Sequence, residues 1–175
     1  TWNQQEDYLI QSDLYRLNSV AAPLRNSLEL SIRYDSLQYL PEQTAVYKLN
    51  GNGSVSYQSG KVDTLNNYIT AKISSLADYI ILADTTVPHL EIVKPQNGQQ
   101  LNSLDKIIFE TKDHLSGIGS EKNFSITVDS LFVVPEWDPE EDRITGRPHW
   151  KFEPGQHNVE ISVYARAGNT IEKNL

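Results

Sequence analysis

The four histidines are the first residues to consider for metal or catalytic chemistry. They are His89, His114, His149 and His157, and no two of them have the His-x-x-x-His spacing or another spacing typical of metal ligands. A catalytic zinc ion needs several protein ligands that converge on one point and leave one position open. His149 and His157 could approach each other across a hairpin, but we favour surface or turn positions for all four side chains.

Two groups of oxygen-bearing side chains are candidates for calcium, which takes about six to eight oxygen ligands on a bent loop. The acidic segment 136–142 has the sequence Glu-Trp-Asp-Pro-Glu-Glu-Asp, without a Gly or a D-x-[DN]-x-[DN]-G pattern, so we interpret it as a solvated hairpin tip. The second candidate is the pole at the junction of the two halves of the chain, where Asp84, Asp113 and Asn169 could approach one another. We expect no cofactor, with calcium as the alternative.

Covalent catalysis has little support in this sequence. Ser116 precedes Gly117 in a turn dipeptide, outside any G-x-S-x-G motif. Cysteine is absent, so no thiol nucleophile, disulfide or thiolate metal site can form. No two of the 23 acidic residues have a pattern that marks them as a pair for glycoside hydrolysis. We therefore predict that this chain is not an enzyme, and a small hydrolase is the less favoured alternative.

Trp137, Trp150 and the nine tyrosines offer flat aromatic faces that could stack on sugar rings. One interpretation is therefore a carbohydrate-binding module that uses the two tryptophans. The other interpretation, which we favour, places Trp150 and Phe152 in a hydrophobic core and Trp137 at the end of a strand, because buried aromatic rings dominate such cores.

Alternation of apolar and polar residues predicts short β-strands in both halves of the chain. Leu28, Leu30, Ile32 and Tyr34 alternate with polar residues, which predicts a strand with one buried face. The nearly continuous apolar run 79–82 predicts a strand buried on both faces. The other predicted strands are 14–17, 45–49, 55–58, 69–73, 90–93, 107–111, 124–128, 131–137, 143–145, 159–164 and a last strand from residue 171.

Turn residues separate these strands. Residues 21–23 are expected to form a connecting loop, and the sequence Asn50-Gly51-Asn52-Gly53 predicts a hairpin turn of the primed type, which needs positive φ. Asp129-Ser130 predicts a two-residue hairpin turn. About seven short strands in the second half, with turn signals every 8 to 12 residues or so, are typical of a sandwich. We predict an all-β fold of two tandem antiparallel β-sandwich domains, residues 1–84 and 85–175.

Composition restricts the partners. A net charge of −8 and the lack of a Lys/Arg cluster disfavour nucleic acid and anionic lipid. No apolar run approaches the length of about 18 residues that a membrane helix needs, so we expect no membrane insertion. The sequence lacks a signal-peptide pattern and starts without Met, and we expect it to be a fragment of a longer protein with a targeting or catalytic segment outside it. The absence of cysteine favours a bacterial or intracellular source over an animal secreted one.

Six short segments of the second half occur in a recognisable order and cover nearly all of residues 86–175. They are Thr85-Thr86-Val87-Pro88, Pro95-Gln96-Asn97-Gly98, residues 113–118, Val128-Asp129-Ser130, Pro154-Gly155-Gln156-His157 and Ala167-Gly168-Asn169. In this order they resemble the bacterial immunoglobulin-like (cadherin- or fibronectin-like) modules at the ends of cell-surface and secreted proteins. Cadherin-type modules bind calcium at interdomain poles, but such modules usually carry an Asp where this chain has Ala165.

The first half is similar to a β-sandwich that often precedes these modules in bacterial surface proteins. The segments that carry this similarity are residues 14–17, 28–34, 45–49, 60–63 and 77–79. In such proteins the pair often lies downstream of a peptidase domain, including zinc metallopeptidases of the M23 type. The resemblance implies accessory or adhesion-type modules on a bacterial surface, in the periplasm or outside the cell. The expected partners are neighbouring domains of the same protein and a surface protein or glycan.

The segment Ala83 to His89 is expected to join the two domains stiffly. It has no Gly, Pro88 restricts Val87 to extended conformations, and two β-branched threonines precede Val87. We expect small-angle X-ray scattering to fit one narrow range of interdomain angles. Replacement of Thr85 and Thr86 by Gly should broaden that range, whereas equally broad ranges for both chains would contradict a semi-rigid connection.

Overall fold

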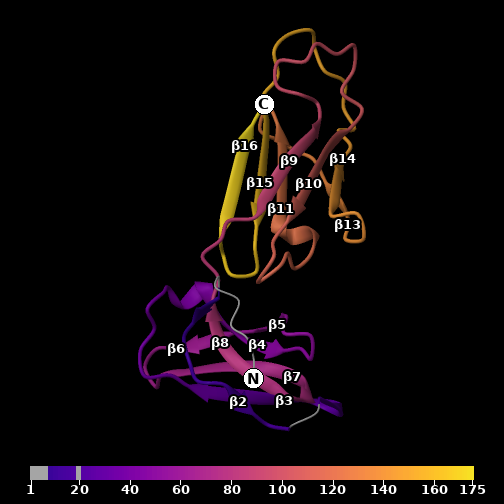
Figure 1. The fold of residues 1–175 in the computed structure, drawn as a ribbon. Coiled ribbons are helices and arrows are strands. Elements are labelled where there is room, and N and C mark those ends of the chain that lie inside the picture. Colours follow the sequence, from indigo (N-terminus) through magenta and orange to yellow (C-terminus); the bar gives the residue numbers. More distant parts are fainter. Residues whose placement is uncertain (1–7, 19–20) are drawn as a thin grey trace. The chain divides into compact units, whose positions relative to one another are not determined.

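The computed structural model describes residues 8–18 and 21–175, and these residues form an all-β protein with antiparallel pairing (Figure 1). The predicted all-β class is therefore confirmed. The chain divides into two compact units, Thr1–Thr85 and Thr86–Leu175, beside the boundary expected between residues 84 and 85. No helix within the described residues has the length and apolar character that a membrane span requires.

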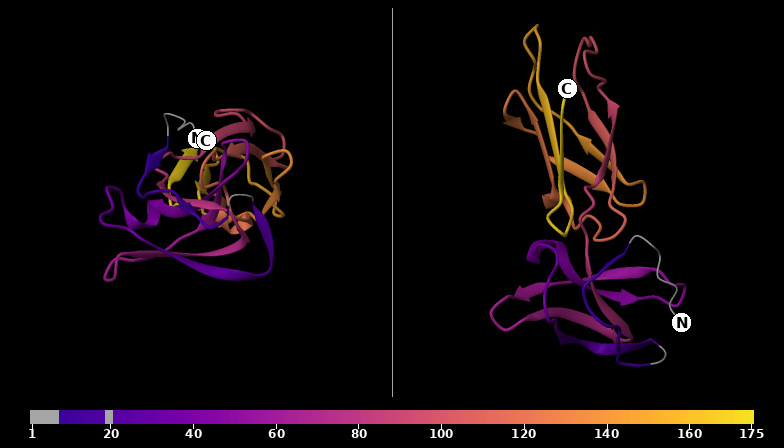
Figure 2. Two further views of the ribbon diagram at one scale, coloured as in Figure 1. Left: turned by 60° about the horizontal axis from the view of Figure 1, so that its bottom comes forward. Right: turned by 60° about the vertical axis from the view of Figure 1, so that its left-hand side comes forward.

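The first unit contains a five-stranded and a three-stranded sheet (Figure 2). The larger sheet has the order β1-β8-β4-β5, with β2 also paired to β8, and the smaller sheet has the order β3-β7-β6. The strands are β1 (Leu9–Ile10), β2 (Tyr15–Arg16), β3 (Ala22–Arg33), β4 (Thr44–Leu49), β5 (Val55–Ser59), β6 (Lys61–Asp63), β7 (Tyr68–Leu76) and β8 (Asp78–Ala83). A 3-10 turn, η1 (Pro41–Gln43), precedes β4.

Apolar side chains from both sheets form one core in this unit. Ile32 of β3 and Ile69 of β7 pack with Val46 of β4 and Ile81 of β8, all at most 2% exposed. The central strand β8 is buried on both faces from Tyr79 to Ala83, as its continuous apolar run predicts. The two sheets thus cover each other's apolar faces, which is the arrangement of a sandwich.

Strand β3 differs from the prediction in two ways. It begins at Ala22, so Ala22 and Pro23, which were expected in a connecting loop, belong to the strand. Ile32 is buried, but Leu28 is 49% exposed although it was expected on the buried face. The register shift in the pairing with β7 lies between Pro23 and Leu28, and from Leu28 to Arg33 the register is continuous. Leu28 therefore lies on the same face as Ile32, but that face is not covered at this part of the strand.

The turn between β4 and β5 is a hairpin turn, but not of the primed type. In this turn, the amide of Gly53 donates to the carbonyl of Asn50 at 3.0 Å. The amide of Asn50 donates to the carbonyl of Ser54 at 2.8 Å. Gly53 has a φ of 86°, whereas Gly51 does not have positive φ, which a primed turn requires. The loop is therefore a longer turn that ends in a glycine with positive φ.

The second unit is built from two four-stranded sheets, β13-β14-β10-β9 and β12-β11-β15-β16. The strands are β9 (His89–Lys94), β10 (Ile107–Lys112), β11 (Phe124–Val128), β12 (Leu131–Phe132), β13 (Pro135–Asp138), β14 (Arg143–Gly146), β15 (Val159–Tyr164) and β16 (Thr170–Asn174), with a 3-10 turn η2 (Glu121–Asn123) before β11. Phe109 and Ile144 of one sheet pack with Ile126 and Ile161 of the other, and all four are 0% exposed.

Two segments of this unit test the turn and strand predictions. Asp129 and Ser130 both have positive φ, 49° and 69°, and join β11 to β12 as the predicted two-residue hairpin turn. The predicted single strand over residues 131–137 is wrong. The chain pairs with β11 only over Leu131–Phe132 and then crosses to the other sheet, where β13 pairs with β14.

Gly60 allows β4 and the chain between β5 and β6 to approach closely, and we expect Gly60→Ala to destabilise the first unit. An added Cβ would lie 2.9 Å from the Cα of Ala45 and 3.0 Å from the carbonyl oxygen of Thr44, both backbone atoms. Overpacking of this kind costs about 1–3 kcal/mol of unfolding free energy. Chemical denaturation should report the loss.

The matched control is Gly51→Ala, because a Cβ at Gly51 has no neighbour within 4 Å and this glycine does not have positive φ. The control should unfold within about 0.5 kcal/mol of the wild-type chain. Equal effects of the two substitutions would contradict the close approach at Gly60.

Candidate functional site

The two tryptophans considered for carbohydrate stacking both pack against the core of the second unit. Trp137 lies in β13 with its ring 5.7 Å from that of Phe124. Trp150 lies in the irregular segment after β14, with its ring 5.8 Å from that of Phe152 and 5.1 Å from that of His149. Both tryptophans are partly buried, so only part of each indole face is open to a ligand.

The three candidate calcium ligands belong to different units. Asp84 is 1% exposed in the first unit, and its amide donates to the carbonyl of Gln43 at 2.8 Å. Asp113 and Asn169 belong to the second unit, where the Asn169 carbonyl accepts a hydrogen bond from the amide of Ala165 at 2.8 Å. Within residues 8–18 and 21–175, no group of three or more His, Cys, Asp or Glu side chains is arranged to hold a metal ion.

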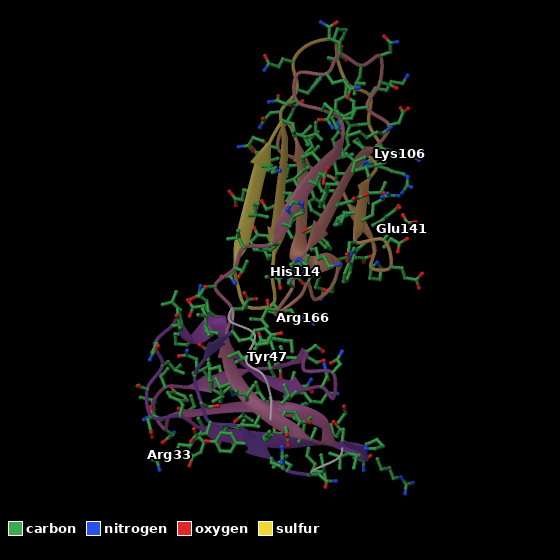
Figure 3. The ribbon with its side chains drawn as sticks, viewed as in Figure 1. Arg33, Tyr47, Lys106, His114, Glu141 and Arg166 are labelled. Carbon is green, nitrogen blue, oxygen red and sulfur yellow. The ribbon has the colours of Figure 1, made fainter. Side chains whose placement is uncertain are left out.

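Asp113 organises its own loop. Its Oδ1 accepts hydrogen bonds from the amide of Gly117 at 2.5 Å, from the hydroxyl of Ser116 at 3.2 Å and from the amide of Leu115 at 3.3 Å. The amide of Arg166 donates to the carbonyl of Gly117 at 2.9 Å, which connects this loop to the turn after β15. Figure 3 shows His114 and Arg166 together at this end of the second unit. Asp113 and Ser116 thus have structural partners within the loop.

His157 is held by both ring nitrogens. Nδ1 lies 2.6 Å from Oδ2 of Asp129, and Nε2 lies 2.8 Å from the carbonyl oxygen of Glu153. A carbonyl can only accept, so Nε2 must carry a proton and cannot ligate a metal while this bond exists. His149 packs edge-on against Trp150 instead. The two histidines that could have converged across a hairpin therefore have separate roles.

Basic side chains pair with the acidic segment 136–142. Arg143 binds Glu141 at 2.7 Å and Glu110 at 2.9 Å, and Lys112 binds Asp142 at 3.2 Å. Arg147 pairs with Glu136. Oδ1 of Asp138 accepts hydrogen bonds from the amides of Glu140 and Glu141 at 3.0 and 3.4 Å. The segment forms the charged β13–β14 turn that the sequence predicts.

The second unit contains a hollow of about 1030 Å³, which we call the amide hollow. It lies at the end of the sandwich where β9 ends and β15 begins, and Figures 1 and 2 show its two loops projecting from the same end. The lining consists of residues 95–104, residues 152–157, Val159 and Leu175. Sequence reasoning identified only a turn at 95–98 here, although the five Asn and Gln residues within 96–102 are a visible signal.

Internal hydrogen bonds fix the backbone of the longer loop. The side-chain nitrogen of Gln96 donates to the carbonyls of Ile92 and Val93, both at 3.0 Å. The amide of Gln96 donates to Oε1 of Gln99 at 2.9 Å, and the amide of Gln99 donates to the carbonyl of Gln96 at 3.0 Å. The shorter loop is fixed by the contacts of His157 with Asp129 and Glu153. Both walls of the hollow are therefore anchored to β-structure.

The anchor of the shorter loop is sensitive to pH. The hydrogen bond to Asp129, reinforced by the bond to the Glu153 carbonyl, raises the pKa of His157 above 6.5. Hydrogen bonds from His157 and from the amide of Asn158 lower the pKa of Asp129 below 3.8. The pair therefore stabilises the fold fully between about pH 3.8 and 6.5, and this contribution is lost as pH rises through the raised His157 pKa or falls through the lowered Asp129 pKa.

We expect the melting temperature of the wild-type chain to fall more between pH 6 and 9 than that of Asp129→Asn. Asn tolerates the positive φ of position 129 and can still accept the Asn158 amide, so the substitution removes mainly the charge. Glu172→Gln, an exposed carboxylate of β16, is the control and should follow the wild-type curve. Parallel curves for the wild-type chain and Asp129→Asn would contradict the assignment.

Comparison with protein families gives a match for the first unit. Residues 1–84 match the model of the Zu5-like domain family, which covers nearly the whole first unit and none of the second. No curated protein matches the chain. The first unit is thus similar to Zu5-like domains.

Proposed function

We propose that the chain is a pair of non-catalytic accessory modules of a bacterial exported or surface protein, which present a neighbouring domain and bind a surface partner. The observation that carries this proposal is the strand order of the second unit. Strands β9, β10, β14 and β13 form one sheet, and β11, β15 and β16 lie in the other. This division corresponds to the ABED and CFG sheets of a constant-type immunoglobulin sandwich, with β12 as an addition.

The second unit is accordingly an immunoglobulin-like module in this proposal. Sandwiches of this type occur in many cell-surface proteins, where the sheets form a scaffold and the end loops carry binding sites. The Zu5-like match of residues 1–84 supports a β-rich companion module beside it. A catalytic domain, such as a peptidase of the M23 type, is proposed upstream of the pair, on the resemblance of the two sandwiches to modules found in that position.

The polar chemistry of the second unit also supports a scaffold role. Two side chains that could do acid–base chemistry are used internally: Asp113 binds three donors of its own loop, and both nitrogens of His157 are occupied. A general base needs a free acceptor within reach of the substrate proton. The rival proposal of a small hydrolase requires such a group, and a calcium-dependent lectin requires convergent oxygen ligands.

The acidic net charge of −8 suits a module that does not adhere to anionic polymers. The partner in this proposal is therefore a neutral glycan or a protein at the bacterial surface. The modules need no cofactor in this function, and calcium is not part of the proposed binding.

We expect the purified chain to co-sediment with isolated bacterial envelopes. The fraction bound should be unchanged by a calcium chelator, and the supernatant should contain no released glycan or peptide fragments, because the modules bind without cleavage. Serum albumin, which is also acidic, is the control for non-specific retention. Release of fragments would favour the hydrolase, loss of binding in chelator would favour a calcium-dependent lectin, and no binding at all would refute the proposal.

A further inference from the structure

The amide hollow has the size of a ligand site. Its volume of about 1030 Å³ lies just above the range of about 300–1,000 Å³ that is typical of small-molecule sites. It is formed by the loop between β9 and β10 and the loop between β14 and β15, at the end opposite the loop of Asp113. In immunoglobulin-like sandwiches, end loops of this kind are where binding sites occur.

The hollow presents side-chain amides that have no partner in the protein. Asn97, Gln100, Asn102 and Gln156 line it, and none of their side chains makes a hydrogen bond to another residue of the described part of the chain. Each carboxamide offers an acceptor oxygen and two N–H donors. A sugar hydroxyl both donates and accepts, so a row of free amides matches a row of hydroxyls.

The charges at the hollow disfavour anionic ligands. The titratable side chains in its lining are Glu153 and His157, and His157 is occupied by Asp129 and the carbonyl of Glu153. The lining contains no Lys or Arg, which phosphate and carboxylate ligands require. An anionic ligand is therefore disfavoured, and the polar part of the lining is mostly uncharged carboxamide, which suits an uncharged polar ligand.

Apolar groups form the other part of the lining. Phe152, Leu104, Val159 and Leu175 contribute apolar surface beside the amides. Phe152 is held in place by Trp150 on one side and by the His157 ring, 5.0 Å away, on the other. A pyranose has an apolar C–H face and a polar rim of hydroxyls, which fits an apolar wall flanked by amides.

We propose that the amide hollow binds a neutral oligosaccharide, and that this is the surface ligand of the binding function proposed above, on which the inference rests. The free amides bind the hydroxyls, and the wall at Phe152 packs against the sugar rings. Trp150 contacts the Phe152 ring and positions it, and Trp150 is not the residue against which the sugar packs. The ligand site thus lies on the loops and not on the tryptophans that the sequence suggests.

An uncharged peptide is the other polar ligand that could meet these amides. A peptide in extended form alternates its donors and acceptors along one line and gains most from pairing with a strand edge. The lining of the hollow is instead almost entirely loop, with amides on two separate segments. This arrangement favours a ligand with hydroxyls on several sides, which is a sugar.

The test measures binding of neutral and charged hexasaccharides to the full chain by calorimetry. The neutral probes are the hexamers of β-1,4-linked glucose, β-1,4-linked N-acetylglucosamine and α-1,4-linked glucose, and the charged probe is the hexamer of galacturonic acid. At least one neutral hexamer should bind and the galacturonate should not. The double variant Gln100→Ala/Gln156→Ala should weaken that binding by about tenfold or more, because it removes several hydrogen bonds.

The control double variant is Asn26→Ala/Gln38→Ala, which removes two exposed amides of the first unit and should bind like the wild-type chain. All four positions are on the surface, so both variants should retain the wild-type melting temperature. A Ser103→Trp variant, which fills the hollow from an exposed position, should abolish binding independently of the amides.

Each other outcome overturns the inference. Neutral hexamers that bind equally to wild type and the hollow variants place the glycan site elsewhere, while the proposed surface function stands. No binding of any hexamer, together with intact binding to envelopes, refutes the glycan ligand alone. Binding of an uncharged twelve-residue peptide of Gly, Ser and Asn that is lost in the hollow variants assigns the hollow to peptide. Failure to bind envelopes as well refutes the proposed function itself.

Discussion

The need of each sheet to cover its apolar face with another sheet determines the structure of both units. In the second unit Ile126 and Ile161 of one sheet meet Phe109 and Ile144 of the other, and each is fully buried. Burial of one such side chain contributes about 1.5–3 kcal/mol. Because the core and the strand pairing hold the two sheets together, the sandwich serves as a scaffold for its loops. The loops at its ends are therefore available for other interactions.

The loops at the two ends of the second unit differ in how their polar side chains are bonded. At one end, Asp113 closes its loop with three hydrogen bonds and Arg166 connects it to the next turn. At the other end, internal bonds of Gln96 and His157 fix the backbones of two loops but leave neighbouring side-chain amides without protein partners. The anchored backbone limits the entropy lost on binding to that of ordering the free amide side chains.

The sequence predicts the strands well where the alternation of residue types is informative, and less well elsewhere. Leu131 to Pro135 is apolar at every position, so the period-2 signal is lost, and only the packing decides that the chain leaves β11 after Phe132 and crosses to the other sheet. Leu28 alternates in register with the buried Ile32 and is still 49% exposed, because the local pattern does not encode how far along β3 the opposite sheet covers that face. The amide hollow is harder to predict from the sequence than the strands, because residues 95–104 and 152–157 meet only through the tertiary fold. The composition of residues 96–102 shows that amides are concentrated there, but it does not show that residues 152–157 lie opposite them.

The distribution of charge explains why recognition at the hollow depends on hydrogen-bond geometry. The chain carries a net charge of −8, yet the densest acidic segment pairs with Arg143, Arg147 and Lys112 on the β13–β14 side of the sandwich. The field of the whole chain disfavours anions everywhere, and the lining of the hollow contains no cation that would offset this. Attraction at long range is therefore absent for a neutral ligand, and its affinity depends on the match of amides to hydroxyls and on the apolar wall at Phe152. A site of this kind discriminates by the positions of hydroxyl groups, because each amide left unpaired on binding carries a desolvation cost.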